Sequence, residues 1–152
     1  MKEVRKSLSI STKNIPKKIP IYGNMDYRNP YCPDEALEQA SFFNQIRLNY
    51  PKSWGLIATS IQNESGKESG FRTHLAKKAG LIAGAPDVII PGKRTFLCEL
   101  KRRDRTKSRV GQKQIDYLLA AQAAGCFVCI ALGADAAWEA FNKWKDEKNA
   151  DT

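Results

Sequence analysis

The sequence of 152 residues predicts an α/β domain in which helices and strands alternate. Three observations support this prediction. Apolar side chains recur at helical spacing over residues 34–49, two short apolar stretches flank the Pro-Gly pair at 91–92, and a glycine precedes the seven-residue apolar run at 126–132. The expected order is helix, strand, short helix, two strands, helix, strand and helix.

Residues 1–33 are expected to form a basic N-terminal arm, and residues 34–148 the folded domain. The arm holds four prolines and many Ser, Asn and Lys residues, without sustained periodicity. Such a segment forms little regular structure, and we expect it to be ordered only where it packs on the domain or on a nucleic acid. A mitochondrial transit peptide is the less favoured interpretation of this segment.

The first helix is expected to end at about Asn49. Pro33 would occupy its N1 position, with Asp34 and Glu35 in the first turn. Its buried stripe would comprise Leu37, Ala40, Phe43 and either Ile46 or Arg47.

A strand is then predicted over residues 54–61, which are apolar and partly β-branched. Residues 62–70 are expected to form a polar loop with two glycines. A short helix would begin at Ser69 or Gly70 and end at Gly80.

A β-hairpin is predicted next, with strands at Asp87–Ile90 and Thr95–Lys101 and a turn over residues 91–94. The segment Arg102–Arg109 is a charged connection, which leads into a helix that begins at Ser108 or just after it.

That helix is expected to end at Ala124, where Gly125 stops it. Cys126–Leu132 would form a buried strand, and Asp135 would cap the last helix. Three aromatic residues of the last helix would pack in the core or, as an alternative, form an apolar face for self-association; they are Trp138, Phe141 and Trp144.

The charge of the chain points to a polyanionic partner. Lysine and arginine number 25 against 16 acids, a net charge of +9. Residues 1–33 hold seven bases against two acids, and residues 93–113 hold nine against two. Such clustering favours nucleic acid as the partner, although a basic surface kept for solubility is the alternative.

Two classes of protein are excluded by composition. The longest apolar run, seven residues, is far shorter than the roughly 20 needed to cross a membrane, and the N-terminus has no apolar core of a secretory signal. The four cysteines at positions 32, 98, 126 and 129 are too few and too irregular for a disulfide framework. We therefore expect a reducing, cytoplasmic setting.

The hairpin carries the candidate chemistry. If it is centred on Lys93, Asp87 lies directly opposite Glu99, with their Cβ atoms about 4.5–5.5 Å apart, and Lys101 shares the face of Glu99. Two carboxylates at that distance repel by about 3 kcal/mol at an effective dielectric constant near 20. A divalent cation such as Mg²⁺ would reverse the sign of this interaction. A surface hairpin with an ordinary salt bridge is the alternative.

Pro86-Asp87 followed by Glu99-Leu100-Lys101 resembles the motif of the PD-(D/E)xK nuclease superfamily. The chain is more closely similar to its VRR-NUC branch, including small phage-type members, over about residues 34–132. The matching features are Gly84-Ala85-Pro86-Asp87, Glu99-Leu100-Lys101, Gln114, Gly125 before a strand, Glu35–Gln39 and Ile61–Glu64.

This resemblance implies a restriction-endonuclease-like fold, with a mixed central sheet flanked by helices. The extended basic N-terminal arm, residues 1–33, lies outside the resemblance. It implies that Asp87, Glu99 and the Leu100 carbonyl bind Mg²⁺ or Mn²⁺, and that Lys101 orients or deprotonates the attacking water. Gln114 would orient Lys101 or the scissile phosphate. Either Glu35 or Glu38 would contact the metal or its water shell, and both are kept because they share a helix face.

The implied activity is hydrolysis of phosphodiester bonds in DNA, with branched DNA such as four-way junctions as substrate and a homodimer as a further expectation. A phage or prophage origin is implied as well. A non-catalytic nucleic-acid-binding module with the same fold is the first alternative. A thiol-redox protein built on Cys126 and Cys129 is a weaker one, because buried core cysteines explain this pair better.

The expected phosphate contacts lie beside the hairpin. The basic side chains after its second strand would line the DNA backbone, although a solvated loop is the alternative. His74 would reach a phosphate or be an ordinary half-exposed histidine. The full set is Arg102, Arg103, Arg105, Lys107, Arg109, Lys113, Arg72 and His74.

Overall fold

A computed structural model describes residues 15–61, 74–75 and 77–150 of the chain. Its centre is a four-stranded mixed sheet with the strand order β1-β4-β3-β2. The strands are β1 (Ile21–Tyr22), β2 (Val88–Ile90), β3 (Phe96–Lys101) and β4 (Phe127–Leu132). The helices are α1 (Glu35–Asn49), α2 (Trp54–Ile57), α4 (Gln112–Ala123) and α5 (Ala134–Ala150), with a 3-10 turn at Arg105–Lys107.

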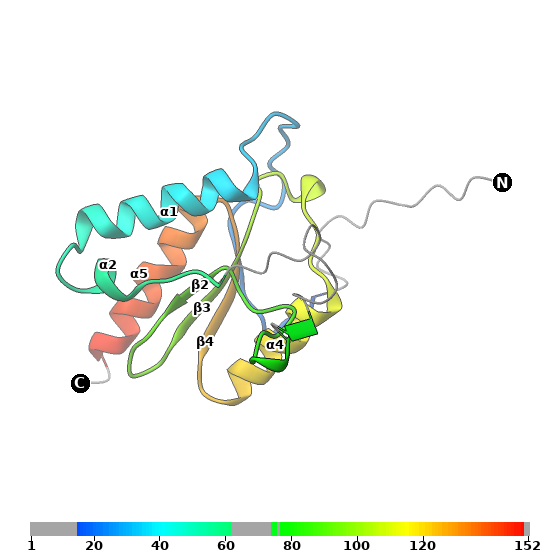
Figure 1. The fold of residues 1–152 in the computed structure, drawn as a ribbon. Coiled ribbons are helices and arrows are strands. Elements are labelled where there is room, and N and C mark those ends of the chain that lie inside the picture. The colour runs from blue at the N-terminus through cyan, green and yellow to red at the C-terminus, as the bar shows by residue number, and fades with distance from the viewer. Residues whose placement is uncertain (1–14, 62–73, 76, 151–152) are drawn as a thin grey trace.

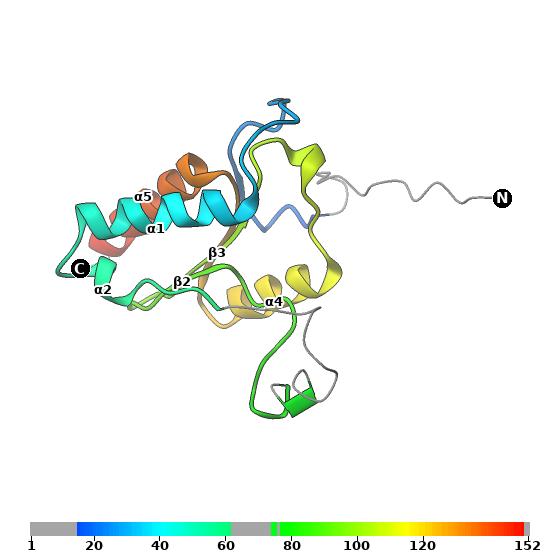
Figure 2. The ribbon, with the colours of Figure 1, turned by 45° about the horizontal axis from the view of Figure 1, so that its top comes forward.

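Helices cover both faces of the sheet (Figures 1 and 2). Helices α1 and α5 pack on one face, against Phe96, Cys98 and Leu100 of β3, while α4 packs on the other, against Leu97. Because side chains alternate along a strand, Glu99 and Lys101 belong to the α4 face. The expected α/β architecture, a mixed sheet flanked by helices, is confirmed.

The hairpin has the register that the sequence predicts. Strands β2 and β3 are antiparallel, with Val88 opposite Cys98 and Ile90 opposite Phe96. The same register, continued by one residue, sets Asp87 against Glu99. Strand β4 is parallel to β3, so the carboxyl end of each of these two strands lies at the edge of the sheet where Lys101 stands.

The prediction of a strand over residues 54–61 is wrong. Residues 54–57 form the one-turn helix α2, and only Thr59 bridges to β2, at Ile89. The backbone N–H of Ala58 donates to the Trp54 carbonyl, and the Trp54 ring packs against Tyr50. A short apolar run does not distinguish a strand from a helical turn, and here the packing of Trp54 on Tyr50 favours the turn.

Two helix starts differ from the sequence prediction. Pro33 precedes α1 instead of occupying N1, because the Asp34 side chain accepts a hydrogen bond from the Leu37 N–H and thus caps the helix. Helix α5 begins at Ala134, so Asp135 lies in its first turn and is not the cap.

The expected buried stripe of α1 is confirmed at Phe43 and Ile46 and is wrong at its other positions. Leu37 and Arg47 are exposed, and so is Ala40. The buried residues of α1 are Glu38, Phe42, Phe43 and Ile46. A buried glutamate at position 38 shifted the stripe, and a hydrophobicity pattern cannot foresee this.

Residues 15–33 pack on the domain. Ile21 and Tyr22 form β1, which pairs in parallel with β4, and the side chains of Ile15, Ile19 and Cys32 are buried. The described part of the expected arm therefore contributes a strand and core side chains, while residues 1–14 lie outside the described residues. Within the described chain, no helix has the length and hydropathy of a membrane span.

Other expected elements agree closely. Helix α4 begins at Gln112, later than the expected start at Ser108 or just after it, and ends at Ala123, where Gly125 follows with a positive φ of 99°. Strand β4 begins at Phe127, one residue later than expected. Of the short helix that was expected to end at Gly80, residues 74–75 and 77–78 are described and helical, and Gly80 has a positive φ of 106°.

Candidate active site

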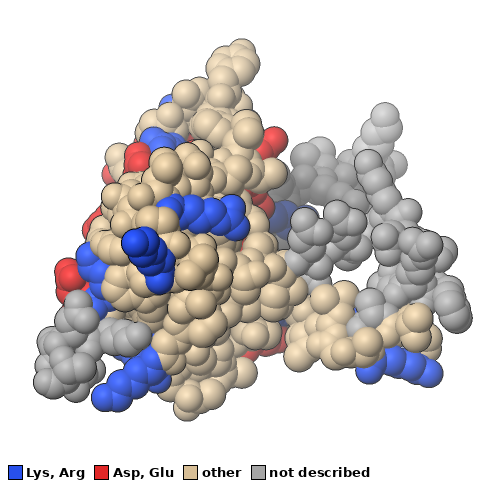
Figure 3. Space-filling view, turned by 60° about the vertical axis from the view of Figure 1, so that its left-hand side comes forward, with Lys and Arg blue, Asp and Glu red and all other residues tan. Residues whose placement is uncertain are grey.

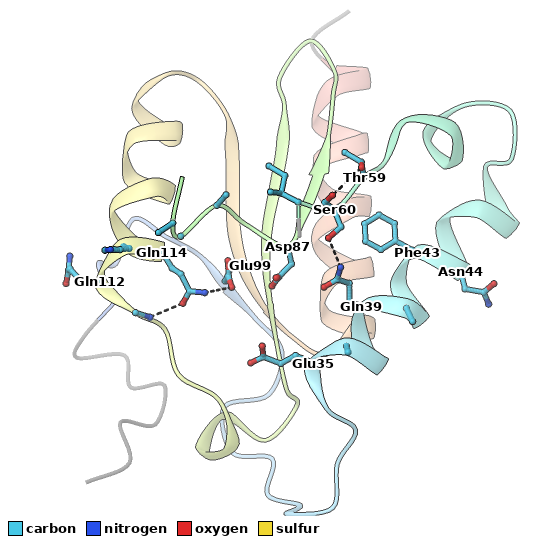
Figure 4. Close-up of a pocket in the computed structure, with 18 of the residues that line it drawn as sticks. Glu35, Gln39, Phe43, Asn44, Thr59, Ser60, Asp87, Glu99, Gln112 and Gln114 are labelled. Atoms are coloured by element: carbon cyan, nitrogen blue, oxygen red, sulfur yellow. Dashed lines mark hydrogen bonds between the residues drawn. The ribbon is translucent and has the colours of Figure 1, made fainter. Parts of the chain in front are cut away.

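An open pocket of about 1080 Å³ lies between α1 and α4, at the end of the hairpin opposite its turn (Figure 4). Both hairpin carboxylates, Asp87 and Glu99, line it. Glu35 enters from α1 and Gln114 from α4, so four side chains from separate segments converge on one space.

Asp87 is placed by the loop that leads into β2. Gly84 in this loop has a positive φ of 89°, and a Cβ there would lie 2.4 Å from the carbonyl oxygen of Lys113. Only a glycine allows the loop to approach the start of α4 this closely. Oδ2 of Asp87 then accepts a hydrogen bond of 2.9 Å from the backbone N–H of Leu100.

Glu99 is buried, with 2% of its surface exposed. Its Oε1 accepts a hydrogen bond of 2.7 Å from Gln114 Nε2, whereas its Oε2 is buried and has no hydrogen-bond partner among the described residues. Burial, and secondly the negative charge of Asp87, raise the pKa of Glu99 to about 8, while Lys101 acts in the opposite direction. A buried carboxylate oxygen without a partner is costly, and a cation would satisfy it.

Lys101 is buried beside these acids, with 4% of its surface exposed. Its Nζ lies 3.3 Å from Glu99 Oε1, 3.5 Å from Gln114 Oε1 and 3.9 Å from Glu35 Oε1. An ammonium held by three oxygens from three elements has little freedom to move.

Gln114 connects the two halves of the site. Its Oε1 accepts a hydrogen bond from the Gly111 N–H at the start of α4, and its Nε2 donates to Glu99 (Figure 4). This fixes which amide atom faces the carboxylate, so Gln114 orients Glu99 as well as Lys101.

The two acids of α1 have different surroundings. Glu35 lines the pocket, and its Oε1 accepts a hydrogen bond of 2.9 Å from Ser108 Oγ. Glu38 does not line the pocket. It is buried and accepts hydrogen bonds from Arg103 Nε and from the Ala134 N–H.

The donor set fits a hard divalent cation. Asp87 and Glu99 are carboxylates, the ligands that Mg²⁺ and Mn²⁺ take, and Glu99 Oε2 is the unsatisfied oxygen. No group of three or more His, Cys, Asp or Glu in the described part of the chain is arranged around one metal position. Backbone carbonyl and water oxygens would therefore complete the coordination, as Mg²⁺ commonly requires.

The basic residues after β3 divide into two groups. Arg102 donates to the carbonyls of Cys32 and Pro33, and Arg105 donates to the carbonyl of Met25. Arg103 pairs with Glu38 and Asp135. These three therefore hold residues 25–33 and α5 in place. The other expected phosphate contacts within the described residues are exposed; they are Lys107, Arg109, Lys113 and His74.

Lys113 lines the pocket from α4. Arg72, the remaining member of the expected set, lies outside the described residues. On the face shown in Figure 3, Lys and Arg side chains are scattered over a mainly uncharged surface, so no continuous basic field covers that side.

Three of the cysteines and the aromatic side chains of α5 belong to the core, whereas Cys126 is partly buried beside it. Cys129 is fully buried and lies opposite Cys98 on β3, and a hydrogen bond to Cys129 together with burial raises the pKa of the Cys98 thiol. Phe141 and Trp144 are buried and Trp138 is partly buried in one aromatic cluster. These positions match core packing better than a thiol-redox centre or an interface.

Two contributors to the site were not predicted from sequence. Ser108 is buried and joins Glu35 to the Arg102 N–H, and Gly111 anchors Gln114. A serine in a basic loop gives no sequence signal of such a role.

Comparison with solved structures finds a similar fold. The chain matches a protein described as "VRR_NUC domain protein" with a TM-score of 0.61 and 19% sequence identity, over 73% of this chain and 87% of that one. No family model and no curated protein matches the sequence. The likeness confirms the expected restriction-endonuclease-like, VRR-NUC-like fold, and at this identity it shows the fold alone.

Proposed function

We propose that this protein is a metal-dependent endonuclease that hydrolyses phosphodiester bonds in DNA. The observation that carries the proposal is the pair Asp87 and Glu99, which line one pocket although both are acids and Glu99 Oε2 has no partner within the described chain. Lys101 lies 3.3 Å from the same glutamate. A structural salt bridge between Lys101 and Glu99 does not need a second carboxylate beside it, whereas a metal site does.

Asp87, Glu99 and the Leu100 carbonyl would hold Mg²⁺ or Mn²⁺. A cation bound there would supply charge stabilisation to the phosphate and an activated water. Lys101 would orient that water or accept its proton, and Gln114 would keep Glu99 and Lys101 in register. Of the two α1 acids, Glu35 is the one that lines the pocket, so we assign it the contact to the metal or its water shell.

DNA as the substrate is supported by the net charge of +9 and by the fold. Lys107, Arg109, Lys113 and His74 are the exposed candidates for phosphate contacts. A preference for four-way junctions, a homodimer and a phage or prophage origin rest on the resemblance to small VRR-NUC proteins. A cytoplasmic setting rests on the cysteine pattern and the N-terminal composition.

The test is a titration of Mg²⁺ and Mn²⁺ against junction, flap, single-stranded and linear duplex DNA, with EDTA as the metal-free control. We expect cleavage that requires the metal and that leaves 5′-phosphate and 3′-hydroxyl ends. Lys101→Ala should abolish cleavage while DNA binding survives, and Lys101→Met serves as a variant that keeps the buried volume. Salt-sensitive binding without metal-dependent cleavage would identify the non-catalytic module instead.

A further inference from the structure

The pocket extends well beyond the two carboxylates, along α1. The side chains of Glu35, Gln39, Phe43 and Arg47 all line it. They are spaced four residues apart, so they form one stripe on successive turns of the helix. Figure 4 shows the first three of these side chains, those of Glu35, Gln39 and Phe43, on the side of α1 that faces the pocket. The proposed chemistry uses only the Glu35 end of this stripe.

The charge changes sign along the stripe. It begins with an acid at Glu35 and ends with a cation at Arg47. Between them, Gln39 Nε2 donates a hydrogen bond of 2.7 Å to Ser60 Oγ. A DNA strand whose scissile phosphate lies at a metal ion near Glu35 would therefore meet the positive side chain of Arg47 at the other end of the stripe.

Arg47 packs on an aromatic ring and has no acidic partner among the described residues. Its guanidinium carbon lies 5.3 Å from the centre of the Phe43 ring, and the side chain is exposed. No Asp or Glu of the described residues forms a salt bridge with it. Arg102 and Arg103, in contrast, are bound to protein oxygens. A planar guanidinium fixed by an aromatic ring is well suited to bind a phosphate with two hydrogen bonds.

We propose that the α1 stripe is the path of the DNA strand that is cut, and that Arg47 binds a backbone phosphate of that strand away from the scissile bond. This inference rests on the proposed function. Twelve residues of helix separate Glu35 from Arg47, a rise of about 18 Å. This distance corresponds to at most roughly five base-pair steps of 3.4 Å, measured along the axis of a B-form duplex. The substrate must then extend up to about five nucleotides to one side of the scissile phosphate.

The experiment measures binding of fluorescein-labelled DNA without divalent metal, at several salt concentrations, so that it does not depend on cleavage. For Arg47→Ala we expect binding about 5- to 20-fold weaker at low salt. The slope of log K against log salt should be smaller by about 0.9, the loss of one phosphate contact. Lys143→Ala on α5, an exposed lysine outside the pocket, removes the same charge and should leave the slope unchanged.

Substrate length provides the second measurement. Shortening the DNA one nucleotide at a time from one end should weaken wild-type binding at a length of at most about five nucleotides beyond the cleavage point. On DNA shorter than that length, Arg47→Ala should have no further effect. Arg47→Lys should bind with intermediate affinity, because it keeps the charge but not the planar fork.

The outcomes separate the two proposals. If Arg47→Ala binds with wild-type affinity and slope while Lys101→Ala still abolishes cleavage, the strand path is wrong and the nuclease assignment stands. If wild-type protein cuts nothing but Arg47→Ala loses one phosphate contact, the DNA-binding role of Arg47 stands, and the nuclease chemistry is wrong. If Arg47 only stabilises the last turn of α1, Arg47→Ala will lower the melting temperature and leave the salt slope unchanged. That result also overturns the inference.

Discussion

Glu35 and Glu38 lie one turn apart on α1, yet they serve different parts of the molecule. Glu35 lines the pocket and lies 3.9 Å from Lys101 Nζ. Glu38 is buried and ties Arg103 and the first turn of α5 to α1. One helix thus contributes one acid to the candidate site and one to the scaffold that holds it.

Substitutions of these two acids should therefore have opposite profiles. Glu35→Gln should reduce metal-dependent cleavage at least tenfold and leave thermal stability nearly unchanged. Glu38→Gln should cost about 1–3 kcal/mol of stability, because Arg103 and the Ala134 N–H lose a charged acceptor. Cleavage rates and chemical unfolding of both variants test this. A Glu38→Gln protein that is fully stable but inactive would reverse the two roles.

The stability of the metal-free protein should depend on the protonation of Glu99. The pKa of a glutamate in an unfolded chain is near 4.3, whereas that of Glu99 in the folded protein is raised to about 8. The folded state thus binds the proton more tightly, and the stabilisation is complete below pH 4.3 and is lost as the pH rises through 8.

With both proteins in EDTA, we therefore expect the melting temperature of Glu99→Gln to rise relative to that of the wild type between pH 5 and pH 8.5. The variant keeps the hydrogen bond to Gln114 but carries no charge. Measuring both proteins over the same pH range cancels the other titrating groups. A difference that does not change with pH would show that the pKa of Glu99 is not raised.

Gly84 should be essential because of its position and not only its conformation. Gly84 and Gly125 both have a positive φ, so alanine at either costs about 1–2 kcal/mol. A Cβ at Gly125 meets nothing within 4 Å, whereas one at Gly84 meets the Lys113 carbonyl at 2.4 Å. Gly84→Ala should therefore lose more stability than Gly125→Ala and should also reduce cleavage. Equal effects of the two variants would contradict this account.

The hairpin and its acids could be predicted from sequence because their determinants are local. The Pro-Gly turn at 91–92 fixes the register, and the period of two along a strand then sets Glu99 against Asp87 and Lys101 on the same face. Gly125 likewise marks the end of α4 and the start of β4.

The features that were missed depend on contacts between distant segments. Strand β1 exists because Ile21 and Tyr22 find an open edge at β4, which no local pattern reveals. Ser108 reaches the site through Glu35, 73 residues away in the sequence. The choice between Glu35 and Glu38 depended on where Arg103 lies, so the sequence alone left it open.

Divalent metal should stabilise the folded protein through Asp87 and Glu99. A ligand that binds only the folded state adds RT ln(1 + [L]/Kd), which is about 1.4 kcal/mol at a concentration ten times the Kd. For a chain of this size that raises the melting temperature by about 3–6 °C. We expect this shift with Mg²⁺ or Mn²⁺ at pH 8, and we expect Asp87→Asn and Glu99→Gln to remove it. Asp146→Asn, which changes an exposed acid on α5, should keep it. A shift that survives in both site variants would place the metal elsewhere, because the two hairpin carboxylates are the ligands on which the proposed site depends.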